Sequence, residues 1–495
     1  MRFPPYADLD ADQKALYADA PIDKALLVTG PPGTGKTVIA MHRATKLAYG
    51  GDTPVTILMF SKVLSRYTRT TDIPLDNIKI THLHDWVTGW YYRGFETRPP
   101  KLSQHIFDWP QITQQISECT ADLLPWLNWG HLIVDEGQDF SPEMYCCFMT
   151  LVNHPLFTAN HLTAPTLTVF ADDNQTINEN GSTLAELSAA LNASTRNKRW
   201  WRLTKNYRNS REIAEFARYY QLSGASAAHL PEQQSGSQPL FLAYSFGTDY
   251  IPLIVNNAMA KDVGVIVFGT IDDVKGMYSA IKVCIEKKKK NYRLQMYSSK
   301  KKDRLLHNEQ QLHFDQPPSI TVVHMQSVKG LEFDSVFLVN MNTLVARDHG
   351  EIDTYKKLYV ASSRARSQLF MLWNGGISDQ LRLFPSPDKK LCTYKEQGTW
   401  TPPFTQQLQT VEWLPSATHL HRQKIQQDQL PQTLVALGAE RAKTLLITVA
   451  ERAADRRVLI QHINELDINN NDNLTDLILE LGSSTIAQLI QEAQA

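Results

Sequence analysis

Short runs of apolar, often β-branched residues recur along the chain, and each run ends in a group of polar or glycine residues. Runs of this length predict strands that are buried in a sheet. The stretch that follows residue 37 instead has the spacing of a helix. We expect strands at residues 25–29, 131–134, 167–170, 263–268, 320–323 and 335–339. The pattern therefore predicts an α/β fold with parallel sheets.

The last part of the chain has a different composition. Residues 398–432 are rich in proline and glutamine, which predicts a linker. From residue 433 onward apolar residues recur at helical spacing, and a polar break at residues 467–473 precedes a last amphipathic helix. We therefore expect a small helical C-terminal domain at residues 433–495.

The composition narrows the class of protein further. The 495 residues are 42% hydrophobic and 20% charged, which is typical of a soluble globular chain of two to four domains. No signal pattern and no bilayer-spanning apolar run is present, so we expect a cytoplasmic protein without a membrane partner. The five cysteines form no metal-binding spacing and are expected to be free thiols. A net charge of -1 means that nucleic-acid binding would depend on local basic surface.

The sequence GPPGTGKT lies between the first predicted strand and the first helix. Its glycines Gly30, Gly33 and Gly35 allow backbone amides to turn toward a phosphate, at the positive end of the helix that follows. Lys36 can reach the terminal phosphates, and Thr37 can bind Mg²⁺. The segment predicts a site for a nucleoside triphosphate.

Acidic residues follow the second predicted strand, in the sequence DEGQD at residues 135–139. Ligands of α/β sheets bind at the carboxyl ends of strands, where these residues lie. Asp135 is expected to hold hydrated Mg²⁺, and Glu136 to orient or deprotonate the attacking water. The third strand ends in residues 171–175, and Gln175 is a candidate sensor of the γ-phosphate, although such a sequence is also ordinary in turns.

These motifs, in this order, resemble the first motor domain of UvrD/Rep-type superfamily I helicases. The segment at residues 9–13 resembles the adenine-reading segment of that family, which implies that Gln13 contacts the base. Three later segments resemble the family motifs NYRS, KGLEF and YVAxTRA; they are residues 203–210, 328–333 and 359–366. The resemblance implies that Tyr207 stacks on adenine and that Arg208 and Arg364 are arginine fingers.

The resemblance, which covers residues 9–373, implies two RecA-like P-loop domains with ATP and Mg²⁺ in the cleft between them. Its first domain would be residues 1–200, with a small accessory insertion at 91–127, and its second would be residues 201–397. The large insertion that relatives carry in the second domain is missing. The implied nucleotide contacts are Gln13, Gly30, Gly33, Thr34, Gly35, Lys36, Thr37, Tyr207 and Glu332; the catalytic residues are Glu136, Gln175, Arg208 and Arg364; the metal ligands are Thr37 and Asp135.

Contacts to nucleic acid follow less closely from the same resemblance. The implied contacts are Phe60, Lys62, His84, Trp86, His324 and Gln326. Residues 176–181 lack the aromatic side chains that relatives use to stack bases. Lysines at 287–290 and 300–302, with Tyr292 and Tyr297 between them, fit either a base-stacking surface or a solvated charged face.

The sequence therefore predicts an ATP-dependent helicase or translocase on single-stranded nucleic acid, DNA rather than RNA, moving 3′ to 5′ by resemblance. The alternative is a regulatory, nucleic-acid-stimulated ATPase subunit of a larger complex, as in bacterial anti-phage systems, with a protein partner bound through the C-terminal helices. A P-loop kinase or GTPase is disfavoured by the two arginine fingers and by the DEGQD sequence.

Overall fold

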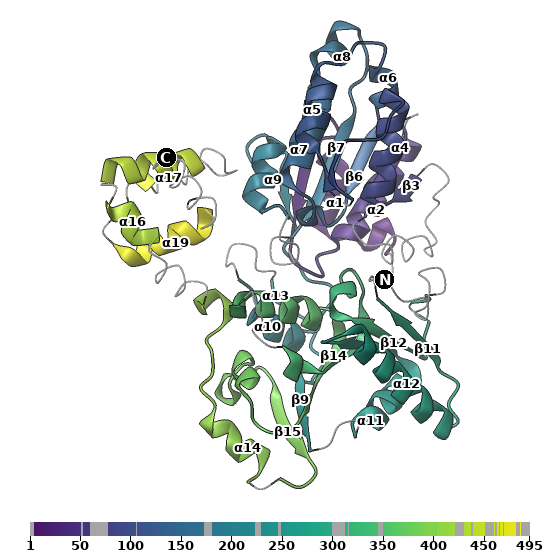
Figure 1. The fold of residues 1–495 in the computed structure, drawn as a ribbon, viewed down its shortest axis with the longest axis vertical. Helices are drawn as coiled ribbons and strands as arrows, with labels where there is room; N and C mark the ends of the chain where they lie inside the picture. Colours follow the sequence, from purple (N-terminus) through teal and green to yellow (C-terminus); the bar gives the residue numbers. More distant parts are fainter. Residues whose placement is uncertain are drawn as a thin grey trace.

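The described part of the chain forms two α/β units and a small helical unit (Figure 1). The computed structural model describes residues 4–50, 53–59, 78–104, 106–172, 181–222, 229–245, 249–298, 312–314, 316–344, 350–400, 402–420, 430–436, 439–450, 460, 463–464, 466–468, 470–481 and 486. The predicted α/β class and the parallel sheets are confirmed.

The first unit contains a six-stranded parallel sheet in the order β3-β2-β6-β7-β1-β8. Its strands are β1 Ala25–Thr29, β2 Val55–Leu58, β3 Ile78–Thr81, β6 His131–Val134, β7 Thr166–Ala171 and β8 Trp200–Arg202. Its helices are α1 Ala11–Asp19, α2 Lys36–Tyr49, α4 Leu83–Phe95, α5 Trp109–Ser117, α6 Leu124–Leu127, α7 Pro142–Val152, α8 Pro155–Ala159 and α9 Leu184–Ala190. The three strands predicted here are all present, and β8 adds an edge strand at the predicted domain boundary.

Both faces of this sheet are covered by a hydrophobic core. Successive side chains of a strand point to opposite faces, so neighbouring residues of one strand belong to different cores. Leu26 and Val28 of β1 pack into one hydrophobic core with α1 and α2. Leu27 packs into another, which contains an aromatic cluster of Trp86, Trp90, Trp129 and Phe148. The predicted insertion at 91–127 folds against this second core, and contains the antiparallel pair β4 (Lys101–Ser103) and β5 (Ile106–Phe107).

The second unit contains a seven-stranded parallel sheet in the order β11-β12-β10-β13-β14-β9-β15. Its strands are β9 Leu240–Tyr244, β10 Asp262–Val267, β11 Arg293–Tyr297, β12 Ser319–His324, β13 Phe333–Val339, β14 Ala365–Asn374 and β15 Thr393–Gln397. Its helices are α10 Arg211–Arg218, α11 Ile251–Asn257, α12 Ile271–Lys287, α13 Gly350–Ser362 and α14 Phe404–Gln407.

Both α/β units also contain short 3-10 helices. They are Tyr6–Asp8, Gly137–Asp139, Ala258–Ala260, Met325–Ser327, Met341–Thr343, Asp379–Leu383, Pro387–Lys389 and Leu408–Thr410.

Two segments pack differently from their sequence interpretation. Part of the predicted linker belongs to the second unit, because Phe404, Leu408 and Ala417 are buried in its core. Tyr297, which we considered for base stacking, is 5% exposed and packs in the same core. Proline and glutamine content therefore did not mark a free linker over the described residues 402–420.

The C-terminal unit is a group of helices (Figure 1), and it has its own hydrophobic core. Its described helices are α16 Leu430–Ala436, α17 Ala439–Ala450 and α19 Asn471–Leu481. Every residue of that core lies between residues 430 and 486. Over the described residues, none of the helices has the length and apolar character needed to span a bilayer.

Candidate nucleotide-binding cleft

A cavity of about 730 Å³ is lined by residues of both α/β units. The first unit contributes the loop between β1 and α2 and Glu136, two residues beyond β6, and the second contributes the N-terminal ends of β13 and β14. The predicted residues that line it are Gln13, Gly33, Gly35, Lys36, Thr37, Glu136, Tyr207, Arg208, Glu332 and Arg364. Residues that were not predicted also line it, including Pro4, Pro5, Asp8, Asp334 and Arg366.

The glycine loop has the backbone conformation that a phosphate cradle requires. Gly33 and Gly35 have φ angles of +80° and +83°, in the left-handed region that favours glycine. A Cβ on Gly33 would lie 2.3 Å from Oδ1 of Asn206, and one on Gly35 would lie 2.6 Å from Nε2 of Gln13. Both glycines are therefore required by backbone conformation, and Gly33 is required by packing as well, because an added Cβ would lie 2.9 Å from Cβ of Arg208.

The predicted base contact, Gln13, is fixed at one end of this loop. Its backbone N–H donates to the Asp10 side chain at 2.6 Å, and its own Oε1 accepts from the Asp10 N–H at 3.2 Å, which closes a capping box at the start of α1. Its Nε2 donates to the carbonyl of Thr34 at 3.2 Å. Gln13 therefore connects the first helix to the glycine loop.

The residues predicted to bind Mg²⁺ lie together. The Thr37 hydroxyl donates to Oδ2 of Asp135 at 2.7 Å, and the backbone N–H of Glu136 donates to Oδ1 of Asp135 at 3.0 Å. Burial, and after it the adjacent Glu136 carboxylate, raise the pKa of Asp135 to about 6. A hydroxyl and a carboxylate beside the phosphate cradle are oxygen ligands of the kind that Mg²⁺ prefers. This donor set fits the predicted ion.

Glu136 is held in place by a neighbour that the sequence analysis did not single out. Gln138 donates from Nε2 to Oε2 of Glu136 at 2.6 Å, and its Oε1 accepts from the backbone N–H of Asp172 at 2.9 Å. Burial alone would raise the pKa of Glu136, but the ammonium groups of Lys329 and Lys36 lower it to about 2. Glu136 is therefore an ionised, oriented carboxylate at the cavity wall.

Lys329 of the second unit pairs with acidic residues of the first. Its Nζ lies 2.6 Å from Oδ2 of Asp139 and 3.6 Å from Oε2 of Glu136. Burial opposes the charged form, but the carboxylates of Asp139 and Glu136 outweigh it and raise the pKa of Lys329. On the first unit, Lys36 donates to the carbonyls of Gly30 and Pro31 and lies 3.6 Å from Oδ2 of Asp172.

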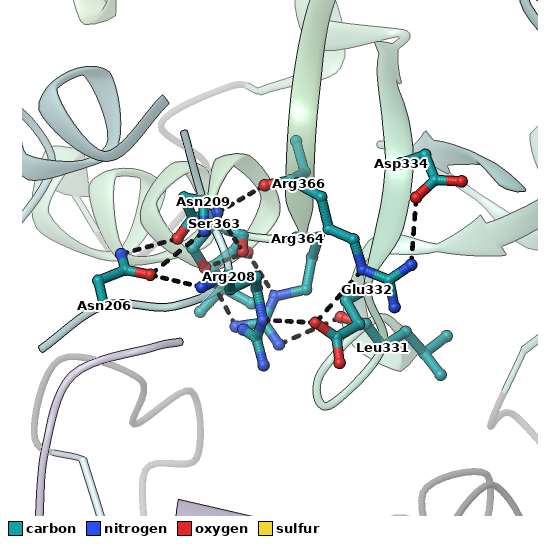
Figure 2. Close-up of polar contacts among 11 residues, drawn as sticks. Asn206, Arg208, Asn209, Leu331, Glu332, Asp334, Ser363, Arg364 and Arg366 are labelled. Atoms are coloured by element: carbon teal, nitrogen blue, oxygen red, sulfur yellow. Dashed lines mark hydrogen bonds and ion pairs between the residues drawn. The ribbon is translucent and has the colours of Figure 1, made fainter. Parts of the chain in front are cut away.

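The two predicted arginine fingers lie side by side on the second unit (Figure 2). Nε of Arg208 donates to Oε2 of Glu332 at 3.0 Å, and Nε of Arg366 lies 3.7 Å from the same oxygen. Burial would raise the pKa of Glu332, but Arg208 and Arg366 lower it to about 2. Arg364 is 1% exposed, and its Nε donates to the carbonyl of Val360 at 2.9 Å. Burial and then the nearby Arg208 lower the pKa of Arg364 to about 9.

Tyr207 lies on the cavity wall and is 45% exposed. Its backbone N–H donates to the carbonyl of Gly33 at 2.8 Å, and Nζ of Lys205 lies 5.5 Å from the centre of its ring. The exposed ring fits the predicted stacking role.

Only some of the residues predicted to contact nucleic acid are exposed. The prediction that Trp86 contacts nucleic acid is wrong. Trp86 is 4% exposed, and its ring stacks on that of Trp90 inside the core of the first unit, with the ring centroids 5.3 Å apart. His324 is buried, and its Nε2 lies 3.0 Å from the carbonyl oxygen of Gly269. His84 and Gln326 are exposed. Phe60, Lys62 and Gln175 lie outside the described residues.

The fold and the cleft define a two-unit α/β protein, and comparison with known proteins finds a match within its second unit. Residues 264–376 match the family model of the UvrD-like helicase C-terminal domain, which confirms the predicted resemblance to UvrD-type helicases. A crystal structure of the C-terminal domain of a possible DNA helicase from Lactobacillus plantarum WCFS1 is 20% identical, with 38% of this chain and 98% of that chain covered and a TM-score of 0.27. No curated protein matches the chain.

Proposed function

We propose that this chain is an ATP-hydrolysing motor that moves along single-stranded DNA in the 3′ to 5′ direction. The observation that carries the proposal is the cavity between the two units, because its lining joins the glycine loop and Glu136 to Arg208 and Arg364. The match to the UvrD-like helicase C-terminal domain supports a helicase-type activity.

In the proposed reaction a water molecule attacks the γ-phosphorus of ATP, and the bond to the β,γ-bridging oxygen breaks to release ADP. Glu136 accepts the proton of that water, and Gln138 keeps its carboxylate oriented. Lys36, Arg208 and Arg364 compensate the charge on the transferred phosphoryl group. A Mg²⁺ ion held by Thr37 and Asp135 would neutralise phosphate charge.

Hydrolysis and movement are coupled because the charges needed for chemistry come from different units. The arginines belong to the second unit, and the glycine loop and carboxylates belong to the first. The ion pair between Lys329 and Asp139 also crosses this boundary, at 2.6 Å. A change in the separation of the units therefore changes the catalytic geometry directly, as in enzymes gated by domain closure.

The track is single-stranded DNA by the resemblance to UvrD-type helicases. His84 and Gln326 are the described candidates for contacts to it, because both side chains are exposed. Because the large accessory insertion of relatives is missing, the motor should translocate on single strands yet unwind long duplexes poorly without another protein.

ATP turnover measured with single-stranded DNA, duplex DNA and single-stranded RNA tests this function. Single-stranded DNA should stimulate turnover most, and displacement of streptavidin should occur from the 5′ end of a biotinylated strand and not from the 3′ end. An absence of ATP turnover with every nucleic acid would contradict the proposal. Displacement from the 3′ end only would contradict the direction and leave the motor activity in place.

The C-terminal unit favours a second candidate, a regulatory ATPase subunit of a larger complex. Its core contains only residues 430–486, so its described part is stabilised independently of the two motor cores. Such an appendage can present its helices to another protein. Strand-displacement assays separate the two candidates, because a regulatory subunit would hydrolyse ATP without separating even a short duplex.

A further inference from the structure

The side chain of Asn209 joins the two chain segments that carry the arginine fingers (Figure 2). Its Nδ2 donates to the carbonyl of Ala365 at 2.6 Å and to the carbonyl of Ser363 at 3.1 Å. These two carbonyls flank Arg364, and Asn209 itself directly follows Arg208. One amide group therefore links the backbone on both sides of one arginine to the backbone beside the other.

The acceptor of the same amide is also used. Oδ1 of Asn209 accepts from Nδ2 of Asn206 at 3.0 Å, and Oδ1 of Asn206 accepts the backbone N–H groups of Arg208 and Asn209 at 3.0 and 3.2 Å. Asn209 is 4% exposed, so water does not compete for these hydrogen bonds. The loop that carries Arg208 is thus fixed internally and against the turn that carries Arg364.

Asparagine is the side chain whose chemistry fits this position. Two carbonyl oxygens need two donors, and the third contact needs an acceptor, which a single primary amide supplies. An aspartate has the same shape but would turn an oxygen toward both carbonyls. A serine, which the NYRS motif has at this place, offers one hydroxyl donor and a shorter reach.

We propose that Asn209 is a positioning residue that sets the spacing of Arg208 and Arg364 around the γ-phosphate. The inference rests on the proposed ATP hydrolysis. A backbone hydrogen bond from Ser210 N–H to the Arg366 carbonyl, at 2.8 Å, also joins the two segments and does not need the Asn209 side chain. Loss of that side chain should therefore leave the segments together while their arginines are displaced.

The test uses Asn209→Asp and Asn209→Ser in the full chain, with ATP turnover measured at saturating single-stranded DNA oligonucleotide. We expect kcat to fall about 10- to 100-fold, since a displacement of about 1 Å costs about 100-fold in rate. KM for ATP and Kd for a non-hydrolysable ATP analogue should change less than about threefold, because positioning affects the transition state more than binding. Asn342→Ser is the matched control, because Asn342 donates to the carbonyl of Asn374 at 2.6 Å, outside the cavity lining.

A double variant separates positioning from general loss of structure. Asn209→Asp combined with Arg364→Ala should turn over ATP no more slowly than Arg364→Ala alone, because the spacing has no role once one finger is missing. A parent-like kcat in both Asn209 variants, an equal loss in Asn342→Ser, or a multiplicative further loss in the double variant would overturn the inference. No ATP turnover in the parent would overturn the proposed function, and this inference with it.

Discussion

The two walls of the cleft have opposite charge. In the cavity lining or in contact with it, the first unit has Lys36 and the carboxylates of Asp135, Glu136, Asp139 and Asp172, whereas the second has Arg208, Lys329, Arg364, Arg366 and the carboxylates of Glu332 and Asp334. An acidic wall suits the binding of a metal ion and the activation of water, and a basic wall suits compensation of phosphate charge. The acidic wall has one cation toward the phosphates, Lys36, and the arginine fingers belong to the other wall, so the site is complete only where the two meet.

The charged groups of each wall are oriented by contacts within their own unit. On the acidic wall, hydrogen bonds within one unit orient the carboxylates, as Gln138 does for Glu136. On the basic wall, Arg208 is held by Glu332 and by the loop that Asn206 and Asn209 organise. Variants of either wall should therefore slow the hydrolysis step of the proposed cycle without separating the two units.

The largest effect on ATP turnover is expected from variants of the acidic wall. Lys36→Ala should nearly abolish ATP turnover, because it removes the charge that steadies the β- and γ-phosphates. Glu136→Gln should hydrolyse slowly while it still binds nucleotide, because shape and most contacts of the side chain are retained. Turnover and the Kd of a fluorescent ATP analogue, measured for both variants, would show this separation.

Two substitutions control for effects unrelated to the cleft. Lys46→Ala changes a lysine of the same helix α2 that does not line the cavity, and Glu143→Gln changes an exposed glutamate near the DEGQD sequence. Both should retain parent turnover. Near-normal hydrolysis by Glu136→Gln would show that another group activates the water.

The next effect concerns the basic wall. Arg208→Ala and Arg364→Ala should each lower turnover by roughly three orders of magnitude, the lower end for arginine fingers, with smaller effects on nucleotide binding. The control is Arg211→Ala, since Arg211 pairs with Glu215 on the surface at 3.0 Å. Parent-rate hydrolysis by either finger variant, with single-stranded DNA present, would mean that this arginine does not face the phosphate.

A smaller effect is expected where the walls meet, at Lys329. The pKa of Glu136 is about 2, and the ammonium of Lys329 contributes most to lowering it. Lys329→Met should therefore raise that pKa. Turnover requires ionised Glu136. On acidification, Lys329→Met should therefore lose turnover at a higher pH than the parent. With Mg²⁺ present to keep Asp135 ionised, we expect the acid limb of the pH–rate profile to move up by about 1–3 pH units. Lys282→Met, which changes an exposed lysine, should leave the profile in place; an unmoved limb in Lys329→Met would contradict the electrostatic role.

The sequence predicted the acidic wall better than the contacts between walls. The glycine loop and DEGQD are contiguous segments next to strands, so local pattern was sufficient to place Lys36 and Glu136 together. The pairing of Lys329 with Asp139 joins residues 190 positions apart, and local sequence has no signal for it. Gln138 and Asn209 were missed for a similar reason, because their roles depend on which atoms they meet in the fold.

Burial accounts for the wrong expectation at Trp86. An aromatic residue in a motif-like segment fits base stacking and core packing equally well in sequence, and only the structure shows Trp86 against Trp90 and Phe148. Residues 402–420 were predicted to be part of a linker, but they pack on the second unit. The segment has few apolar residues, yet these are enough to bury Phe404 and Leu408 in the core of that unit.

The smallest effect on turnover is expected from removal of the C-terminal unit. Deletion of residues 430–495 takes away a hydrophobic core whose members all lie within the deleted segment, so the two walls of the cleft keep their packing. A longer deletion, of residues 402–495, also removes Phe404, Leu408 and Ala417 from the core of the second unit, and should lower its melting temperature and abolish turnover. DNA-stimulated ATP turnover and thermal unfolding of both deletions test this contrast. Equal loss of turnover in both would show that the C-terminal helices stabilise the motor itself, whereas parent-like turnover in the longer deletion would show that the basic wall does not depend on those core residues.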